Sequence, residues 1–218
     1  IAAFSTGYRS NGNTYVSNSG DILVSTTGFS NGIVARSWND VYVYNSGDIT
    51  VSTSNIDERA SGIYSLSTFE SAYINNSGDI SALGGIGANG AGSAGNFGAT
   101  TINSGDISVT SSYFYTRYNY YGDLQYYGGW ANGVFANSRF GGVATVINSG
   151  DVEVNSLTEG LGLSAFSSFG NANVYNSGDV KVSGQYVSAY GIFSQGSSYD
   201  QARSGTLEGS QVINLGDV

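Results

Sequence analysis

Short segments in which apolar and polar residues alternate recur along the whole chain, each next to the tetrapeptide Asn-x-Gly-Asp. They precede the tetrapeptide, as in Val41–Tyr44 and Val143–Ile147, and follow it, as in Ile49–Val51 and Val152–Val154. A period of two with many β-branched residues is typical of β-strands. A third segment, Gly-(Ile/Val/Leu)-x-(Ala/Ser), recurs as in Gly32–Ser37. The pattern therefore predicts three strands per repeat and no helix.

The repeat unit is marked by the tetrapeptide Asn-Ser-Gly-Asp. Copies start at Asn18, Asn45, Asn76, Asn103, Asn148 and Asn176, and a variant, Asn-Leu-Gly-Asp, starts at Asn214. Three of the six spacings are 27 or 28 residues, and the others are 31, 38 and 45. We expect the longer repeats to contain loops inserted into the same unit. The longest would be a Tyr-rich loop at about residues 111–131.

A stacked fold follows from this repeat, because one unit of three short strands cannot bury its apolar face alone whereas stacked copies can. Three strands in about 27 residues fit an all-β, three-sided parallel β-solenoid (β-helix). A β-propeller would need four antiparallel strands in about 40–45 residues. We expect a single domain over residues 1–218 with about seven coils, the seventh incomplete. Small Ala or Ser residues in the third strand predict a narrow, dry interior without a ligand cavity.

The tetrapeptide is expected to form a corner between two strands. Asn and Gly are the residues that most readily adopt left-handed backbone conformations, so we expect them to supply such positions here. Stacked Asn side chains can also form an amide ladder from coil to coil. The predicted corner residues are Asn18, Gly20, Asn45, Gly47, Asn76, Gly78, Asn103, Gly105, Asn148, Gly150, Asn176, Gly178, Asn214 and Gly216.

The Asp of each tetrapeptide would form a column of like charges one strand spacing apart. Such repulsion costs somewhat under ~1 kcal/mol per pair in water, and something in every coil must offset it. The favoured interpretation is that each carboxylate accepts backbone N–H groups at its corner. The weaker alternative is a divalent cation, Ca²⁺, between neighbouring carboxylates, although the Gly-Gly-x-Gly-x-Asp calcium repeat is absent. The candidate ligands are Asp21, Asp48, Asp79, Asp106, Asp151, Asp179 and Asp217.

Composition narrows the function classes. The chain has no His and no Cys, so it can contain neither a Cys/His zinc site nor a thiol nucleophile nor a Ser-His-Asp triad. Seven scattered basic residues against sixteen acidic ones, a net charge of −9, argue against nucleic acid as a partner. No apolar run is long enough for membrane insertion. We expect no catalytic residues, no enzyme activity and no cofactor, with Ca²⁺ as the weaker alternative above.

Aromatic residues are the candidate interface. Some fall at outward positions of the third strand and others in the Tyr-rich insertion, where a large ring with a polar tip suits recognition. The alternative is that the chain's own loops cover them. The interface candidates are Tyr113, Tyr115, Tyr118, Tyr120, Tyr121, Tyr126, Tyr127, Trp130, Phe4, Tyr64, Phe135, Phe166 and Phe193.

The repeats resemble the passenger repeats of autotransporter-type surface proteins. The resemblance lies in Val43–Ile49 and in Gly32–Ser37, and covers essentially the whole chain. It implies an exported, β-helical rod and no active site. The family's C-terminal membrane barrel is absent from this sequence, and neither end has a recognisable capping helix.

Function is expected to follow from assembly. The chain begins in the third strand, at Ile1–Ser5, and stops just past a corner at Val218, so a second copy would supply the next strand. We therefore expect head-to-tail self-association into an extracellular fibre or surface filament. The alternative is the shaft of a cell-surface adhesin that binds glycan or a host surface through its aromatic loops.

Overall fold

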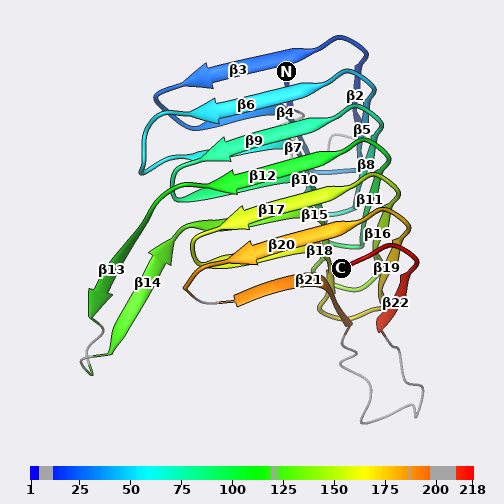
Figure 1. The fold of residues 1–218 in the computed structure, drawn as a ribbon. Coiled ribbons are helices and arrows are strands. Elements are labelled where there is room, and N and C mark those ends of the chain that lie inside the picture. The colour runs from blue at the N-terminus through cyan, green and yellow to red at the C-terminus, as the bar shows by residue number, and fades with distance from the viewer. Residues whose placement is uncertain (5–11, 119–120, 122, 187, 197–209) are drawn as a thin grey trace.

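The computed structural model describes residues 1–4, 12–118, 121, 123–186, 188–196 and 210–218. In this part of the chain all regular structure is β, and the strands wind into stacked parallel coils (Figure 1). The predicted three-sided parallel β-solenoid is confirmed. Within the same residues no helix is long and apolar enough to cross a membrane.

Three parallel sheets form the sides of the coils, and each coil adds one strand to each sheet. Sheet A contains β1 (Ala2–Phe4), β4 (Ser30–Ser37), β7 (Arg59–Ser67), β10 (Gly87–Gly95), β15 (Trp130–Ser138), β18 (Glu159–Ser167) and β21 (Ser188–Gly196). Sheet B contains β2 (Thr14–Asn18), β5 (Val41–Asn45), β8 (Ser71–Asn76), β11 (Gly98–Asn103), β16 (Ala144–Asn148), β19 (Ala172–Asn176) and β22 (Ser210–Asn214). Sheet C contains β3 (Ile22–Thr26), β6 (Ile49–Thr53), β9 (Ile80–Gly84), β12 (Ile107–Ser111), β17 (Val152–Ser156) and β20 (Val180–Gly184).

The register aligns the repeats residue by residue. Asn18 pairs with Asn45, and Ile22 pairs with Ile49. The 45-residue repeat keeps this register too, because Asn103 still pairs with Asn148. Extra residues are therefore placed in the turns, as the unequal spacing predicts.

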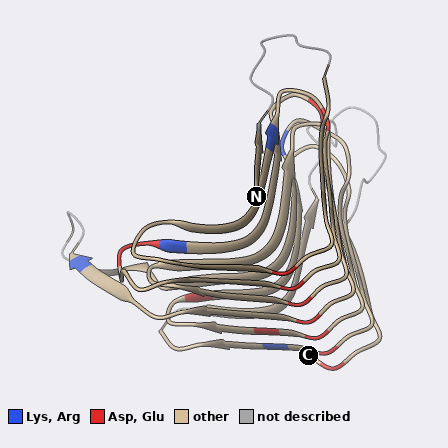
Figure 2. Cartoon of the chain, turned by 90° about the horizontal axis from the view of Figure 1, so that it is seen from above, with Lys and Arg blue, Asp and Glu red and all other residues tan. Residues whose placement is uncertain are grey.

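From β4 onward, the strands of sheet A are long because each continues around a bend. Pairing between β7 and β10 runs up to Ser61 and resumes at Ile63, so Gly62 marks the bend. Seen from above, the coils have an L-shaped outline (Figure 2). A Cβ atom on Gly32, one coil earlier, would lie 2.7 Å from the carbonyl oxygen of Gly62 and would overlap the side chain of Ile49. Glycine is needed at this column because the backbones and the core approach too closely for any side chain.

The core is a set of stacked apolar columns. Sheet C contributes Ile49, Ile80 and Ile107, which are at most 2% exposed. Sheet A contributes Ile33 with the small Ala35, both fully buried. This arrangement matches the predicted inward columns of a narrow interior.

The Tyr-rich insertion is a hairpin and not an irregular loop. β13 (Phe114–Tyr118) and β14 (Leu124–Gly128) pair antiparallel and project away from the coils (Figure 1). Trp130 belongs to β15 of sheet A, so its predicted place in the excursion is wrong.

Candidate functional site: corner columns and aromatic surfaces

The Asn column forms the predicted amide ladder. The Asn76 Nδ2 group donates to Oδ1 of Asn103 at 2.8 Å and to the carbonyl oxygen of its own Gly78 at 2.6 Å. In turn, Asn45 donates to Oδ1 of Asn76 at 2.7 Å. The same two bonds recur from Asn18 to Asn176. Asn76 is fully buried, so the ladder satisfies polar groups that water does not reach.

The Gly column has a different role from the one predicted. The glycines with left-handed φ among the described residues are Gly128, Gly129, Gly141 and Gly142, so the expectation of left-handed corners is wrong. A Cβ atom on Gly78 would instead overlap the carbonyl oxygen of Gly47. The corners stack so closely that each glycine faces the backbone of the preceding corner. Only Gly20, the first of the column, has nothing within 4 Å of such an atom.

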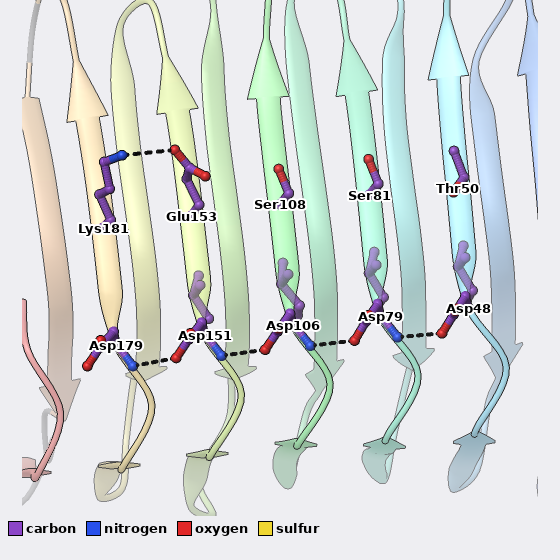
Figure 3. A pocket seen from close by; sticks show the side chains of 14 residues that line it. Asp48, Thr50, Asp79, Ser81, Asp106, Ser108, Asp151, Glu153, Asp179 and Lys181 are labelled. Atoms are coloured by element: carbon purple, nitrogen blue, oxygen red, sulfur yellow. Dashed lines mark hydrogen bonds and ion pairs between the residues drawn. The ribbon is translucent and has the colours of Figure 1, made fainter.

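The Asp column accepts backbone N–H groups, as the favoured interpretation predicts. The carboxylate of Asp106 accepts the N–H of Asp151 at 2.9 Å, and Asp151 does the same for Asp179 at 2.9 Å (Figure 3). Equivalent bonds join the remaining members of the column. All these carboxylates are exposed and lie along one outer corner of the rod (Figure 2).

A shallow groove of about 550 Å³ runs beside this column on the outer face of sheet C. Its floor presents Thr50, Ser81 and Ser108, and one ion pair joins Lys181 to Glu153 at 3.3 Å (Figure 3). In the described part of the chain, no three acidic side chains converge closely enough to hold a metal ion. The groove offers a row of hydroxyl groups and hydrogen-bond acceptors along the rod.

The predicted interface residues fall into two separate groups. Phe166, Phe193, Tyr64 and Phe135 lie half-buried on the outward side of sheet A. The hairpin and its flanks present Tyr115, Tyr118, Tyr121 and Tyr127 as exposed residues and Tyr113 as a half-buried one. Tyr120 and the side chains of Phe4 and Tyr126 lie outside the described part.

The rings of Tyr64 and Phe135 on sheet A pack against their own chain. The ring of Phe135 covers Gly92, where a Cβ atom would overlap it. Gly92 pairs with Tyr64 on its other side, and the Tyr64 and Phe135 ring centroids are 6.5 Å apart. Rings of two coils therefore meet across a coil that lacks side chains at this position.

The structure contains two further aromatic columns that the sequence did not lead us to predict. On sheet B, Tyr15 stacks on Tyr42 with centroids 4.9 Å apart and planes at 10°, and Tyr73 lies next in line at 6.2 Å. The signal was available, since a Tyr stands three residues before the Asn in three successive repeats. The second column follows the turns from sheet A to sheet B: Trp38, Phe69, Phe97, Phe140 and Phe169.

Stacking occupies part of the Tyr column. Tyr15 and Tyr42 each turn one ring face toward the other, so these two faces are not open to a sugar ring, which stacks on an aromatic face. The rings of Tyr42 and Tyr73 are tilted by 47° and do not stack face to face. The pKa of Tyr42 is raised, mainly by burial and secondly by the nearby Asp40 carboxylate. Burial also raises the pKa of Tyr73.

The hairpin is tied to the rod at its base. Gly128 and Gly129 have φ of 75° and 73°, which turns the chain back into the stack. The Ser111 hydroxyl donates to the Gly129 carbonyl at 2.6 Å, and the Thr158 hydroxyl donates to the Gly128 carbonyl at 2.6 Å. The base of the hairpin thus has a fixed position on the coils.

Comparison of the chain with protein-family models, with curated proteins and with solved structures finds no match. The geometry of the repeat therefore carries the functional argument alone.

Proposed function

We propose that the chain is a structural β-solenoid of the cell surface or extracellular space whose coils stack end to end with those of further copies. The support is that the same contacts join every pair of neighbouring coils: the Asn ladder, the Gly column and the Asp chain. The surface with which one coil receives the next is therefore complementary to any other coil of the chain. Such head-to-tail contacts do not close, and they give filaments.

The observation that carries the proposal is the close contact that recurs at each corner from Gly47 to Gly216. A Cβ atom on any of these glycines would overlap the carbonyl oxygen of the preceding corner. At Gly20 the place of a preceding corner is open. The corner at Gly216 of a second copy could take this place with contacts that already occur within the chain.

Export fits the composition and the repeat. Charged residues make up 11% of the chain, and the sequence is rich in Ser, Asn, Gly and Tyr. The repeats resemble those of autotransporter-type passengers, whose solenoids stand outside the cell. The filament would need no cofactor.

The second candidate is the shaft of an adhesin that binds a surface glycan. The exposed hairpin favours it, because Tyr118 is 70% and Tyr121 is 85% exposed. Rings exposed to this extent are accessible to a sugar.

The test uses the first glycine of the corner column. Gly20→Ala should leave the monomer fold intact, since a Cβ atom there has no neighbour within 4 Å. In a stacked copy the same atom would meet a corner carbonyl, so filaments should disappear from electron micrographs. Gly28→Ala, which also has open space, is the matched control and should leave filaments unchanged. Purified protein that stays monomeric in light scattering at high concentration would favour the adhesin instead.

A further inference from the structure

The β13–β14 hairpin is held away from the coils by a firm base. Besides the two hydroxyl bonds to Gly128 and Gly129, the ring of Phe114 packs on Tyr186 with centroids 4.7 Å apart. Beyond this base the hairpin projects from the rod (Figure 1). Its orientation is therefore set by the solenoid while its strands extend into solvent.

The hairpin has a free edge. Among the described residues, β13 pairs with β14 alone. A two-stranded hairpin is at best marginally stable in water, and three or more strands are normally needed. An unpaired strand edge is also a template for another chain. The missing strands are the natural partner of this edge.

We propose that β13 pairs antiparallel with β13 of a second copy, giving a four-stranded sheet in the order β14–β13–β13–β14. A two-fold axis at Thr116 would place Thr116 opposite Thr116, Tyr115 opposite Arg117 and Phe114 opposite Tyr118. This register pairs all five residues of the strand. It also sets the Arg117 guanidinium beside a Tyr ring, whereas a two-fold axis at Arg117 would oppose two like charges.

The pairing strand itself carries two exposed rings. Tyr115 is 46% and Tyr118 is 70% exposed. At about 200 Å² per ring they offer about 230 Å² on each copy beside the paired backbone. The contact is therefore smaller than a standard interface, and main-chain hydrogen bonds along the two strands supply its affinity.

This contact is lateral and uses no coil end, so it stands apart from the proposed end-to-end stacking. Its two-fold symmetry closes at two copies. Combined with end-to-end stacking, it would join rods side by side.

Single cysteines test the pairing, because the chain contains none of its own. Thr116→Cys places the two thiols opposite each other at the axis, so mild oxidation should give a covalent dimer on a non-reducing denaturing gel. Gln125→Cys is the matched control on β14, whose copies would be separated by two intervening strands, or about 14 Å. It should remain monomeric. Crosslinking of Gln125→Cys, or of neither variant, would overturn the proposal.

A charge exchange tests the register in solution, with Gly20→Ala in every chain so that stacking does not contribute. Tyr115→Asp with Arg117→Asp should be monomeric by sedimentation velocity, since acids then oppose acids. Tyr115→Lys should also be monomeric, since Lys opposes Arg117. An equimolar mixture should restore the dimer. Gln125→Glu, an acid on β14, should leave dimerisation unchanged. Dimers of either charged variant alone, or a mixture that stays monomeric with unchanged circular dichroism, would refute the register.

Discussion

The backbone N–H of Asp79 donates to the carboxylate of Asp48 in the preceding coil at 2.9 Å. Along the strands, a backbone N–H donates to a carbonyl oxygen of the neighbouring coil. At this corner the Asp48 carboxylate is the acceptor instead. A hydrogen bond to a charged acceptor contributes about 1.5–3 kcal/mol, which exceeds the repulsion between exposed like charges one strand apart. The acidic column is therefore compatible with the fold without a counterion.

Asp79→Asn should change the free energy of unfolding by less than about 0.5 kcal/mol, because the amide oxygen can still accept the Asp106 N–H and the weaker hydrogen bond is offset by the loss of repulsion from the neighbouring carboxylates. Asp79→Ala removes that acceptor and should cost about 1–2 kcal/mol in urea unfolding. Chelator should not shift the melting temperature of either variant. A large loss of stability in chelator, restored by Ca²⁺, would contradict the hydrogen-bond account.

Gly78→Ala should cost about 3 kcal/mol or more, because its Cβ atom would overlap the Gly47 carbonyl and rigid backbone cannot move aside. Gly20→Ala should cost less than about 0.5 kcal/mol, since the same corner there has open space. Thermal unfolding of the two variants gives the comparison. Equal losses at both positions would mean that backbone conformation, and not close approach, selects glycine.

Asn76→Ala should destabilise the fold by about 3 kcal/mol, because it leaves buried groups of Asn45 and Asn103 without partners. Asn18→Ala, at the solvated first step of the ladder, should cost about 1 kcal/mol. Both can be measured by urea denaturation. A similar small effect at both positions would show that the ladder contributes little.

The Tyr column predicts a loss of stability at high pH. Because the pKa values of Tyr42 and Tyr73 are raised in the folded state, these side chains keep their protons at a pH where the unfolded chain has lost them. Stability should be constant below about pH 9 and fall as pH rises beyond about 10. In urea titrations from pH 8 to about 11, Tyr42→Phe should fall less steeply than the native chain. Equally steep curves for Tyr42→Phe and the native chain would contradict this account.

Gly92 and Phe135 should be energetically coupled. Gly92→Ala alone should be strongly destabilising because the new methyl overlaps the Phe135 ring. Phe135→Ala alone loses the ring's contacts but clashes with nothing. The double variant should be more stable than the sum of the two losses predicts, by about 1–3 kcal/mol. Additive losses in a double-mutant cycle would show that the ring moves aside freely.

The strands and corners of each coil could be predicted from the sequence, because the residues that determine them are close together in the chain and recur in every repeat. Alternation in Val41–Tyr44 and Ile49–Val51 predicts the strands, and Asn-x-Gly-Asp predicts the corners between them. The position of Asn76 above Asn45 follows once the repeats are stacked, and with it the ladder. Each inference needed only neighbouring residues and the period.

Two of the failures concern properties that arise only between coils, and the third concerns a turn inside the insertion. Gly47 looks like a left-handed turn residue until the carbonyl of Gly20 is placed against it. The bend at Gly62 depends on the approach of Ile80, a residue from another sheet. The hairpin was missed because Phe114–Tyr118 pairs with Leu124–Gly128 without an Asn-Gly turn between them.

The small-residue strand β10 affects how the rod comes apart. In a stack where each coil contacts only its neighbours, the coil with least apolar volume is the natural fracture plane. Here Tyr64 reaches Phe135 across Gly92, and the Arg59 guanidinium lies 5.3 Å from the Trp130 ring across Gly87. These second-neighbour contacts link the two halves of the rod past its thinnest point. They should make unfolding of the whole stack a single cooperative event and give a filament mechanical continuity where it would otherwise split.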